Sequence, residues 1–133
     1  MPFGASNDWR RQALPKPEIV SYPIETTVID SAVVSASGVT ADASGPYTGR
    51  RYLLQGTILS KRNDNKYERY VGGSAQNVAG ILFDTIEFAD NTTASNEPVA
   101  FLRRNVSFNK VNIVDYELYK TALASALTTC EFI

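Results

Sequence analysis

The chain has no histidine and a single cysteine, Cys130, among its 133 residues. Without histidine, a Ser-His-Asp triad, a thiol–imidazole pair and a histidine-bearing zinc site cannot be built. One cysteine excludes an intramolecular disulfide. Because Cys130 stands close to Phe132 and Ile133, we interpret it as a small apolar filler of the core. The sequence therefore predicts no catalytic residue, no metal site and no cofactor, and so a protein that is not an enzyme.

A charge excess and long apolar runs are missing as well. The formal net charge is −1, which argues against a protein dedicated to nucleic acid, because phosphate binding needs clustered positive charge. No segment approaches the roughly 18 apolar residues of a membrane-spanning helix, and no apolar signal sequence follows Met1. We expect synthesis in a cytosol, with no nucleic acid and no membrane among the partners.

Prolines divide the chain into two parts. Four of the six prolines fall in residues 1–25, where each removes a backbone donor and fixes φ, so that no regular helix fits. We predict an extended N-terminal arm over residues 1–25 and a single β-rich domain over residues 26–133. The predicted fold class is mostly β (α+β), a small, compact, barrel-like domain with one helix near its C-terminal end.

Patterns of β-branched, aromatic and turn residues place the elements of this domain. The helix is predicted over residues 115–129, with Asp115 capping its first turn. Asn105, a residue that tolerates a left-handed backbone, is predicted to separate the last two long strands. The strands are predicted at residues 26–34, 50–60, 66–71, 78–88, 98–104 and 106–113, and residues 130–133 are either a short strand or a tail docked on the core.

A glycine-rich stretch, "GGSAQNVAGIL", precedes an apolar strand. Such turns often cradle phosphates, but these glycines match neither a Walker A loop nor a dinucleotide fingerprint. We interpret Gly72 and Gly73 as a structural turn, and Gly80 as a place where another part of the backbone packs closely.

Arginine occurs in three adjacent pairs: Arg10-Arg11, Arg50-Arg51 and Arg103-Arg104. Each pair is either ordinary surface charge or a means of docking to carboxylates on a partner protein. Trp9 adjoins the first pair, and tryptophan with arginine is enriched in interface hot spots. The sequence leaves both readings open.

The order of elements over residues 50–133 resembles the head decoration proteins of tailed phages, the phage lambda D type. The resemblance rests on "LLQGTIL", "KYERYV", "GGSAQNVAGIL" and "AFLRRNVSFNKVNI", followed by a helix and a short apolar end. The chain departs from the family at Arg104-Asn105, where a glycine is common. Such proteins form homotrimers at local threefold positions of the expanded capsid. They clamp the major capsid protein and help the head to withstand internal DNA pressure. The resemblance thus implies a virion protein on the outer capsid surface.

The resemblance also implies that the N-terminal segment reaches onto the capsid. Independently, an extended arm with spaced apolar residues suits strand addition to a sheet edge. The residues expected to contact the capsid are Trp9, Arg10, Arg11, Leu14, Pro15, Pro17 and Ile19.

Two other functions compete with decoration. The first is a phage tail or surface β module that binds glycan by stacking sugars on Tyr47, Tyr52, Tyr67 and Tyr70. The second is a hydrolase that uses two of Asp84, Glu87 and Asp90, although Asp84 and Glu87 would point to opposite faces of a regular strand.

Overall fold

Five strands close into a barrel in the computed structural model, which describes residues 13–88 and 95–133, with residues 22–28 described by their backbone. The strands follow one another around the barrel as β1 (Val20–Ser35), β4 (Tyr67–Arg69), β3 (Ile58–Lys61), β5 (Val78–Leu82) and β7 (Asn96–Phe108), and β7 pairs back with β1. All neighbours are antiparallel except β1 and β4, which meet through a parallel bridge, Val34↔Tyr67. The predicted class, a mostly β and barrel-like domain with a C-terminal helix, is confirmed.

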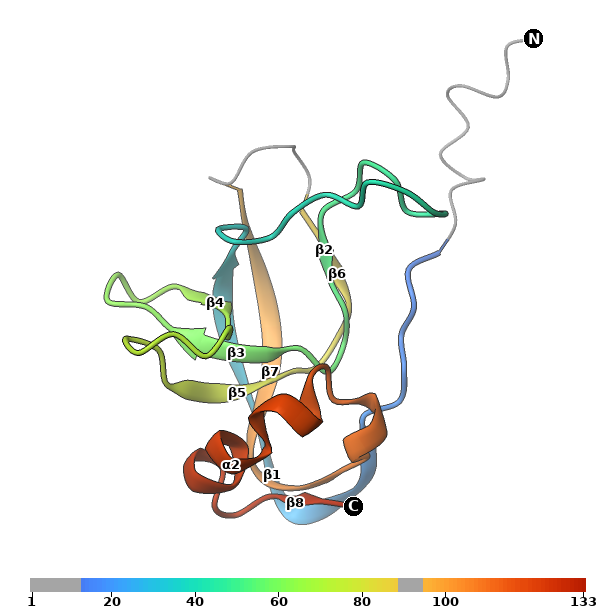
Figure 1. Cartoon of the computed structure of the whole chain (residues 1–133). Coiled ribbons are helices and arrows are strands. Elements are labelled where there is room, and N and C mark those ends of the chain that lie inside the picture. Colours follow the sequence, from blue (N-terminus) through green and yellow to red (C-terminus); the bar gives the residue numbers. More distant parts are fainter. Residues whose placement is uncertain (1–12, 89–94) are drawn as a thin grey trace, which may run out of the picture.

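The remaining elements lie at the two ends of the barrel (Figure 1). At one end β2 (Tyr52–Leu53) and β6 (Ile86–Glu87) form a two-stranded sheet. At the other end lie η2 (Lys110–Asn112), α2 (Tyr116–Ala126) and β8 (Glu131–Phe132), which extends the sheet parallel to β7. The single strand predicted over residues 50–60 is therefore wrong, because its two halves belong to different sheets. The hairpin of β3 and β4 forms as predicted.

Two hydrophobic cores lie on opposite faces of the barrel wall. Neighbouring residues of a strand point to opposite faces. Leu59, Leu82 and Phe101 therefore fill the barrel, while Ile58, Ile81 and Leu102 beside them face outwards. Every barrel strand contributes to the inner core, β1 through Val34 and β4 through Tyr67. The outer core also contains buried residues from the arm, the end of β7 and the segment that follows it: Ile19, Val106, Phe108, Ile113, Leu123 and Leu127.

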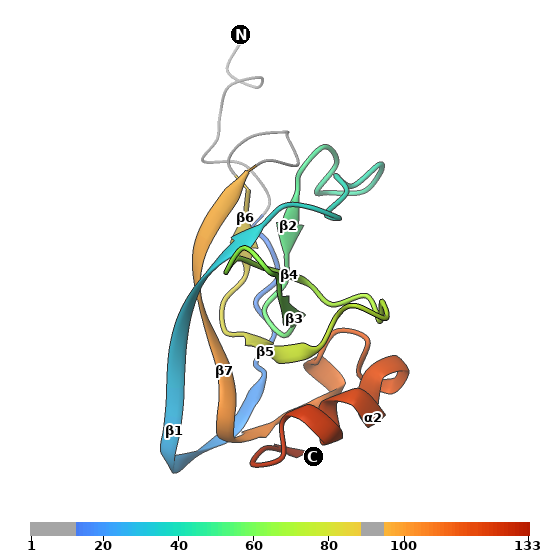
Figure 2. The same cartoon turned by 90° about the vertical axis from the view of Figure 1, so that its left-hand side faces the viewer.

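The ribbon of β1 and β7 turns a sharp corner below the barrel (Figure 2). Between the pairs Pro23↔Val106 and Val28↔Arg104, β1 has residues 24–27 whereas β7 has only Asn105. Asn105 has a φ of 57°, the left-handed backbone expected for it. The prediction of two separate strands around Asn105 is wrong, because β7 continues through the residue opposite a bulge in β1.

The N-terminal strand begins earlier than the sequence suggests. β1 starts at Val20, whose partner on β7 is Phe108, so the expected boundary at residue 25 falls inside a strand. The described part of the arm, residues 13–19, has no regular secondary structure. Figure 1 shows this blue segment running along the outside of the barrel towards β1.

Helix α2 covers the outer core. Leu123 and Leu127 are buried, and Tyr116 and Tyr119 pack against the same cluster, as their predicted common face requires. Asp115 occupies the N-cap position, but its side chain makes no capping hydrogen bond. The predicted cap is wrong because Asp115 has a left-handed φ of 60°, whereas capping side chains usually stand on an extended backbone.

Candidate interaction site

The backbone of the described part of the arm is attached to the loop between β5 and β6 and to the region of η2. The Thr85 hydroxyl donates to the Pro15 carbonyl oxygen at 2.6 Å. The side-chain amides of Asn109 and Asn112 both donate to the Glu18 carbonyl oxygen, at 3.1 and 2.7 Å. The Asn109 N–H donates to the Ile19 carbonyl oxygen at 2.6 Å. Residues 15–19 are thereby fixed along the protein's own surface.

One of the residues expected to contact a capsid is corrected. Ile19 has no exposed surface, because its side chain lies in the outer core with Ile113 and Leu123. It therefore anchors the arm to its own domain. Leu14 and Pro17 are half-buried and Pro15 is exposed. The other three expected contacts, Trp9, Arg10 and Arg11, lie outside the described residues.

The glycine-rich turn is closed by one side chain. Gln76 Oε1 accepts hydrogen bonds from the N–H groups of Val71 and Gly73, at 2.9 and 3.3 Å. Gly72 has a φ of +80°, and a Cβ atom there would lie 2.9 Å from Tyr119 Cε1. A Cβ atom on Gly80 would lie 2.5 Å from Phe101 Cδ2. Gly73 meets nothing nearer than 3.6 Å. These two N–H groups of the turn are therefore hydrogen-bonded within the protein.

In the second arginine pair, Arg50 is bound within the protein. Arg50 donates to both carboxylate oxygens of Glu87, from Nε at 3.0 Å and Nη2 at 2.8 Å. This hydrogen bonding raises the pKa of Arg50 above its ordinary value. Nearby, the pKa of Tyr52 is raised to about 12. The largest cause is its hydrogen bond to Asp42, and the second is burial. Arg51 is half-buried, so this pair offers little to a partner.

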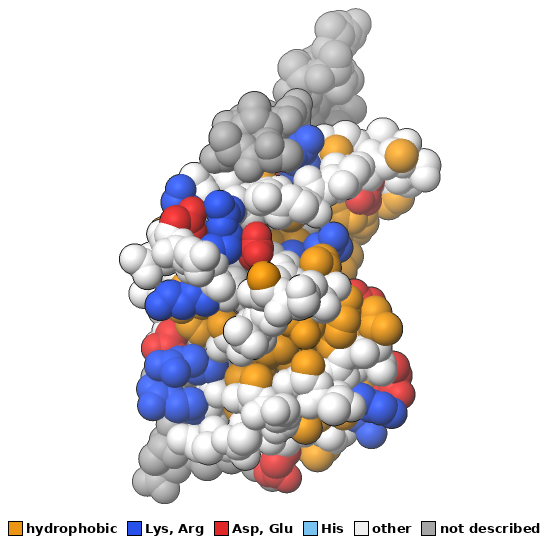
Figure 3. All heavy atoms as spheres, turned by 60° about the vertical axis from the view of Figure 1, so that its left-hand side comes forward, with side chains coloured by type: hydrophobic (Ala, Val, Ile, Leu, Met, Phe, Trp, Pro, Cys, Tyr) orange, Lys and Arg blue, Asp and Glu red, His pale blue; other side chains and the backbone are white. Residues whose placement is uncertain are grey.

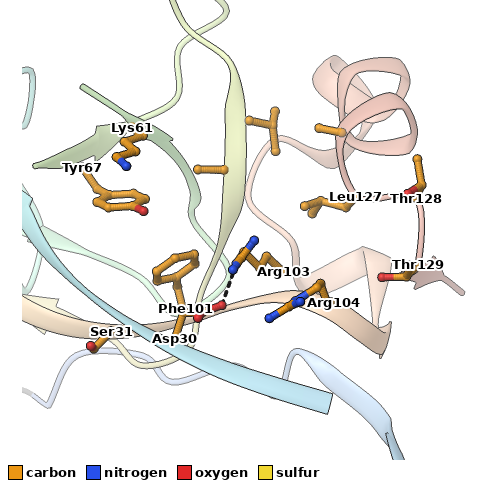
Figure 4. A pocket seen from close by; sticks show the side chains of 13 residues that line it. Asp30, Ser31, Lys61, Tyr67, Phe101, Arg103, Arg104, Leu127, Thr128 and Thr129 are labelled. Atoms are coloured by element: carbon orange, nitrogen blue, oxygen red, sulfur yellow. Dashed lines mark hydrogen bonds and ion pairs between the residues drawn. The ribbon is translucent and has the colours of Figure 1, made fainter. Parts of the chain in front are cut away.

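The third pair borders a groove of about 610 Å³, which we call the seam groove. Figure 4 shows Lys61 and Tyr67 on one side, Asp30 and Phe101 below them, and Arg103 and Arg104 towards the end of α2. Its full lining is Asp30, Ser31, Lys61, Tyr67, Val78, Ala79, Phe101, Arg103, Arg104, Ala126, Leu127, Thr128 and Thr129.

Charge in the seam groove is unbalanced. Asp30 accepts a hydrogen bond from Arg103 Nε at 2.7 Å. Within the described ranges, neither Lys61 nor Arg104 forms an ion pair, and both are exposed. Three cations therefore face one carboxylate. Figure 3 shows lysine and arginine side chains gathered along one side of this face.

The groove lies where the barrel is least completely paired. β1 pairs with β7 in regular register from Ile29 to Ser35 along one edge. In the part of the chain that the structure describes, its other edge meets β4 only at Val34↔Tyr67. Residues 62–66 form the turn between β3 and β4, so no strand among the described residues lies beside residues 29–33 of β1 on this side. This seam leaves an open strand edge next to the cations.

The residues of the two competing functions are not assembled into sites. Tyr67 packs on Phe101 and Tyr70 on Tyr119, while Tyr47 and Tyr52 pair with each other, so the four do not form one platform. Asp84 is paired with exposed Lys16, and Glu87 is held by Arg50. Asp90 lies outside the described residues.

Other chemistry has little support in the geometry. Burial raises the pKa of the Cys130 thiol, which keeps it protonated and weakly nucleophilic. Among the described residues no group of three His, Cys, Asp or Glu side chains could hold a metal ion. No helix in the described ranges is long and apolar enough to cross a membrane.

Sequence reasoning singled out Arg103-Arg104 but missed the rest of the seam groove. Lys61 and Tyr67 were assigned to a hairpin and Asp30 to a strand, and nothing local indicates that the three meet. Their meeting depends on β1 pairing across the barrel. No family model, no curated protein and no solved structure matches this chain.

Proposed function

We propose that this protein is a capsid decoration protein of a tailed phage. It binds the expanded lattice of the major capsid protein as a homotrimer at local threefold positions, on the outer surface of the virion, and stabilises the head against internal DNA pressure. The observation that carries the proposal is the resemblance of residues 50–133 to the lambda D type, above all "GGSAQNVAGIL".

The anchoring of the arm supports this role. The carbonyl oxygens of Pro15, Glu18 and Ile19 accept hydrogen bonds from the folded domain, so the twelve residues before Ala13 are joined to a fixed point. A tether of this kind raises the effective concentration of a binding segment at its target. Residues 1–12 carry Trp9 with two arginines, the combination suited to an interface anchor.

The symmetry of a closed ring and the thermodynamics of binding favour the same role. A closed threefold ring avoids open polymerisation, and a trimer that touches several capsid subunits gains avidity from modest contacts. A partner that binds only the expanded shell stabilises it by mass action. Such a role requires no catalytic group.

Capsid binding by a truncated protein tests the proposal. We expect full-length protein to sediment with expanded capsids that lack decoration, and protein without residues 1–12 to bind at least about tenfold more weakly. Trp9→Ala should weaken binding in the same direction, and Lys120→Ala, on exposed α2 surface, should not.

Copy number provides the second half of the test. In density-banded virions of the phage that encodes the chain, gel densitometry should find it at a level near that of the major capsid protein. Absence from the virion, or a copy number typical of a tail component, would overturn the proposal. Equal capsid binding by full-length and truncated protein would refute the role of the arm.

A further inference from the structure

We propose that the seam groove binds an extended acidic segment of a partner protein, which adds as a strand to the free edge of β1 at residues 29–33. This inference stands apart from the proposed capsid role, because it concerns a different surface from the arm. It rests on three features of the groove: an unpaired strand edge, an excess of cations and an apolar floor.

The strand edge supplies the backbone part of the site. β4 runs parallel to β1 and begins at Tyr67, opposite Val34. A peptide placed in line with β4 would continue that row along residues 29–33, a length of about 13 Å at ~3.3 Å per residue. Alternate N–H and C=O groups of an edge strand point outwards and are ready to pair with an incoming chain.

The cations supply the preference for acidic side chains. Lys61 and Arg104 are exposed and without an ion pair within residues 13–88 and 95–133. Arg103 is held through Nε by Asp30, and in the same ranges its Nη groups donate no hydrogen bond. Figure 4 shows this guanidinium positioned between Phe101 and the end of α2. A guanidinium fixed in this way loses little further freedom when it binds a carboxylate.

The floor of the groove suits the alternation of a strand. The rings of Tyr67 and Phe101 are 5.1 Å apart, and Val78, Ala79 and Leu127 complete an apolar lining. Successive side chains of an added strand point to opposite sides. An alternating acidic and small apolar or β-branched segment would therefore place one set of side chains on the floor and the other near the cations.

Two other occupants fit the groove less well. Residues 1–12 of a second copy contain Arg10 and Arg11 against Asp8 alone, so they carry the same sign as the groove. A nucleic acid has no backbone amide groups, so it would leave the N–H and C=O groups of β1 without partners of matching spacing. An acidic polypeptide satisfies both the charge and the backbone.

Binding of defined peptides to the isolated full-length protein tests the inference. The probe is a short fluorescent peptide of alternating Glu and Thr, measured by fluorescence anisotropy at low salt. We expect saturable binding that weakens with added salt, and an affinity about tenfold lower for each charge removed in Lys61→Gln and Arg104→Gln. Lys110→Gln with Lys120→Gln, which removes two charges outside the groove, should leave the affinity unchanged.

Two further probes separate strand addition from simple charge attraction. The same peptide with N-methyl groups on alternate backbone amides keeps its charge but cannot pair as a strand, so it should bind at least about tenfold more weakly. A single-stranded oligothymidylate should bind more weakly than the Glu-Thr peptide. The inference is overturned by absent binding, by equal binding of the methylated peptide, or by tighter, Lys61-dependent binding of the oligonucleotide. Because no capsid is present, each result is independent of the decoration proposal.

Discussion

At the scale of single residues, the barrel wall packs tightly at a position that has no side chain. Gly80 lies in β5 beside the ring of Phe101, and its backbone also approaches the Leu102 carbonyl oxygen, which a Cβ atom would meet at 2.8 Å. A methyl group at this position has nowhere to go, since Phe101 belongs to the inner core. A Cβ atom on Gly73, in the preceding turn, would make only ordinary van der Waals contact with Gln76, at 3.6 Å.

We predict that Gly80→Ala lowers the free energy of unfolding by about 1–3 kcal/mol, because overpacking forces the Phe101 ring or the backbone to shift. Gly73→Ala is the matched control and should change it by no more than about 0.5 kcal/mol. Urea unfolding followed by circular dichroism measures both. Equal effects of the two substitutions would contradict the assignment of Gly80 to a close packing contact.

At the scale of elements, the start of β1 shows what sequence patterns miss. Proline usually marks the outside of a strand, so Pro23 favoured an arm that ends at residue 25. In the structure Pro23 pairs with Val106 beside an irregularity of the ribbon, a place where a strand tolerates proline. Likewise Asn105 was expected to end a strand, but its left-handed backbone bends β7 without interrupting it.

The boundary has a direct consequence for truncation. Deleting residues 1–12 should leave a folded domain, whereas deleting residues 1–25 should prevent folding. The longer deletion removes fully buried Ile19 and the pairing of Val20 and Pro23 with β7. Loss of one such buried side chain costs about 2–5 kcal/mol, a large part of a typical total stability.

Circular dichroism and thermal unfolding of the two truncated proteins provide the measurement. The protein without residues 1–12 serves as the control for the loss of chain length. A cooperative thermal transition in the shorter protein, near that of the control, would show that residues 13–25 are not part of the folded unit.

At the scale of the whole molecule, two cores share one wall. Ile58 and Leu59 are sequence neighbours, yet they belong to the outer and inner core respectively. The same holds for Ile81 with Leu82, and for Leu102 with Phe101. Each of these strands contributes side chains to both cores. A change that loosens one core therefore displaces the backbone that supports the other.

We therefore predict a single cooperative unfolding transition. Leu59→Ala in the inner core and Leu123→Ala in the outer core should each lower stability by about 2–5 kcal/mol. Both should shift the loss of helix signal and of near-ultraviolet aromatic signal together in urea. If Leu123→Ala instead released α2 in a separate early step, the two cores would be independent.

The alternation and the turn residues were enough to predict the barrel-like class, the hairpin of β3 and β4, and the buried face of α2. They could not predict the seam groove, because Lys61 and Asp30 meet only through pairing between distant parts of the chain. The prediction that Asp115 caps α2 is wrong for a related reason. Tertiary contacts of the preceding turn, including Val114 N–H to the Gly56 carbonyl oxygen, determine the backbone there.

The pairing of β1 with β7 also governs when the chain can fold. β1 ends at Ser35, and its partner strand β7 begins only at Asn96. Ile19 is buried against Ile113 and Leu123, which come later still in the chain. Long loops must close before such contacts form, which makes folding slow. On the ribosome, the apolar side chains of the first half emerge well before anything can cover them. The barrel therefore closes only after its last strands have been synthesised, and the nascent chain depends on its charged and polar turns to stay in solution until then.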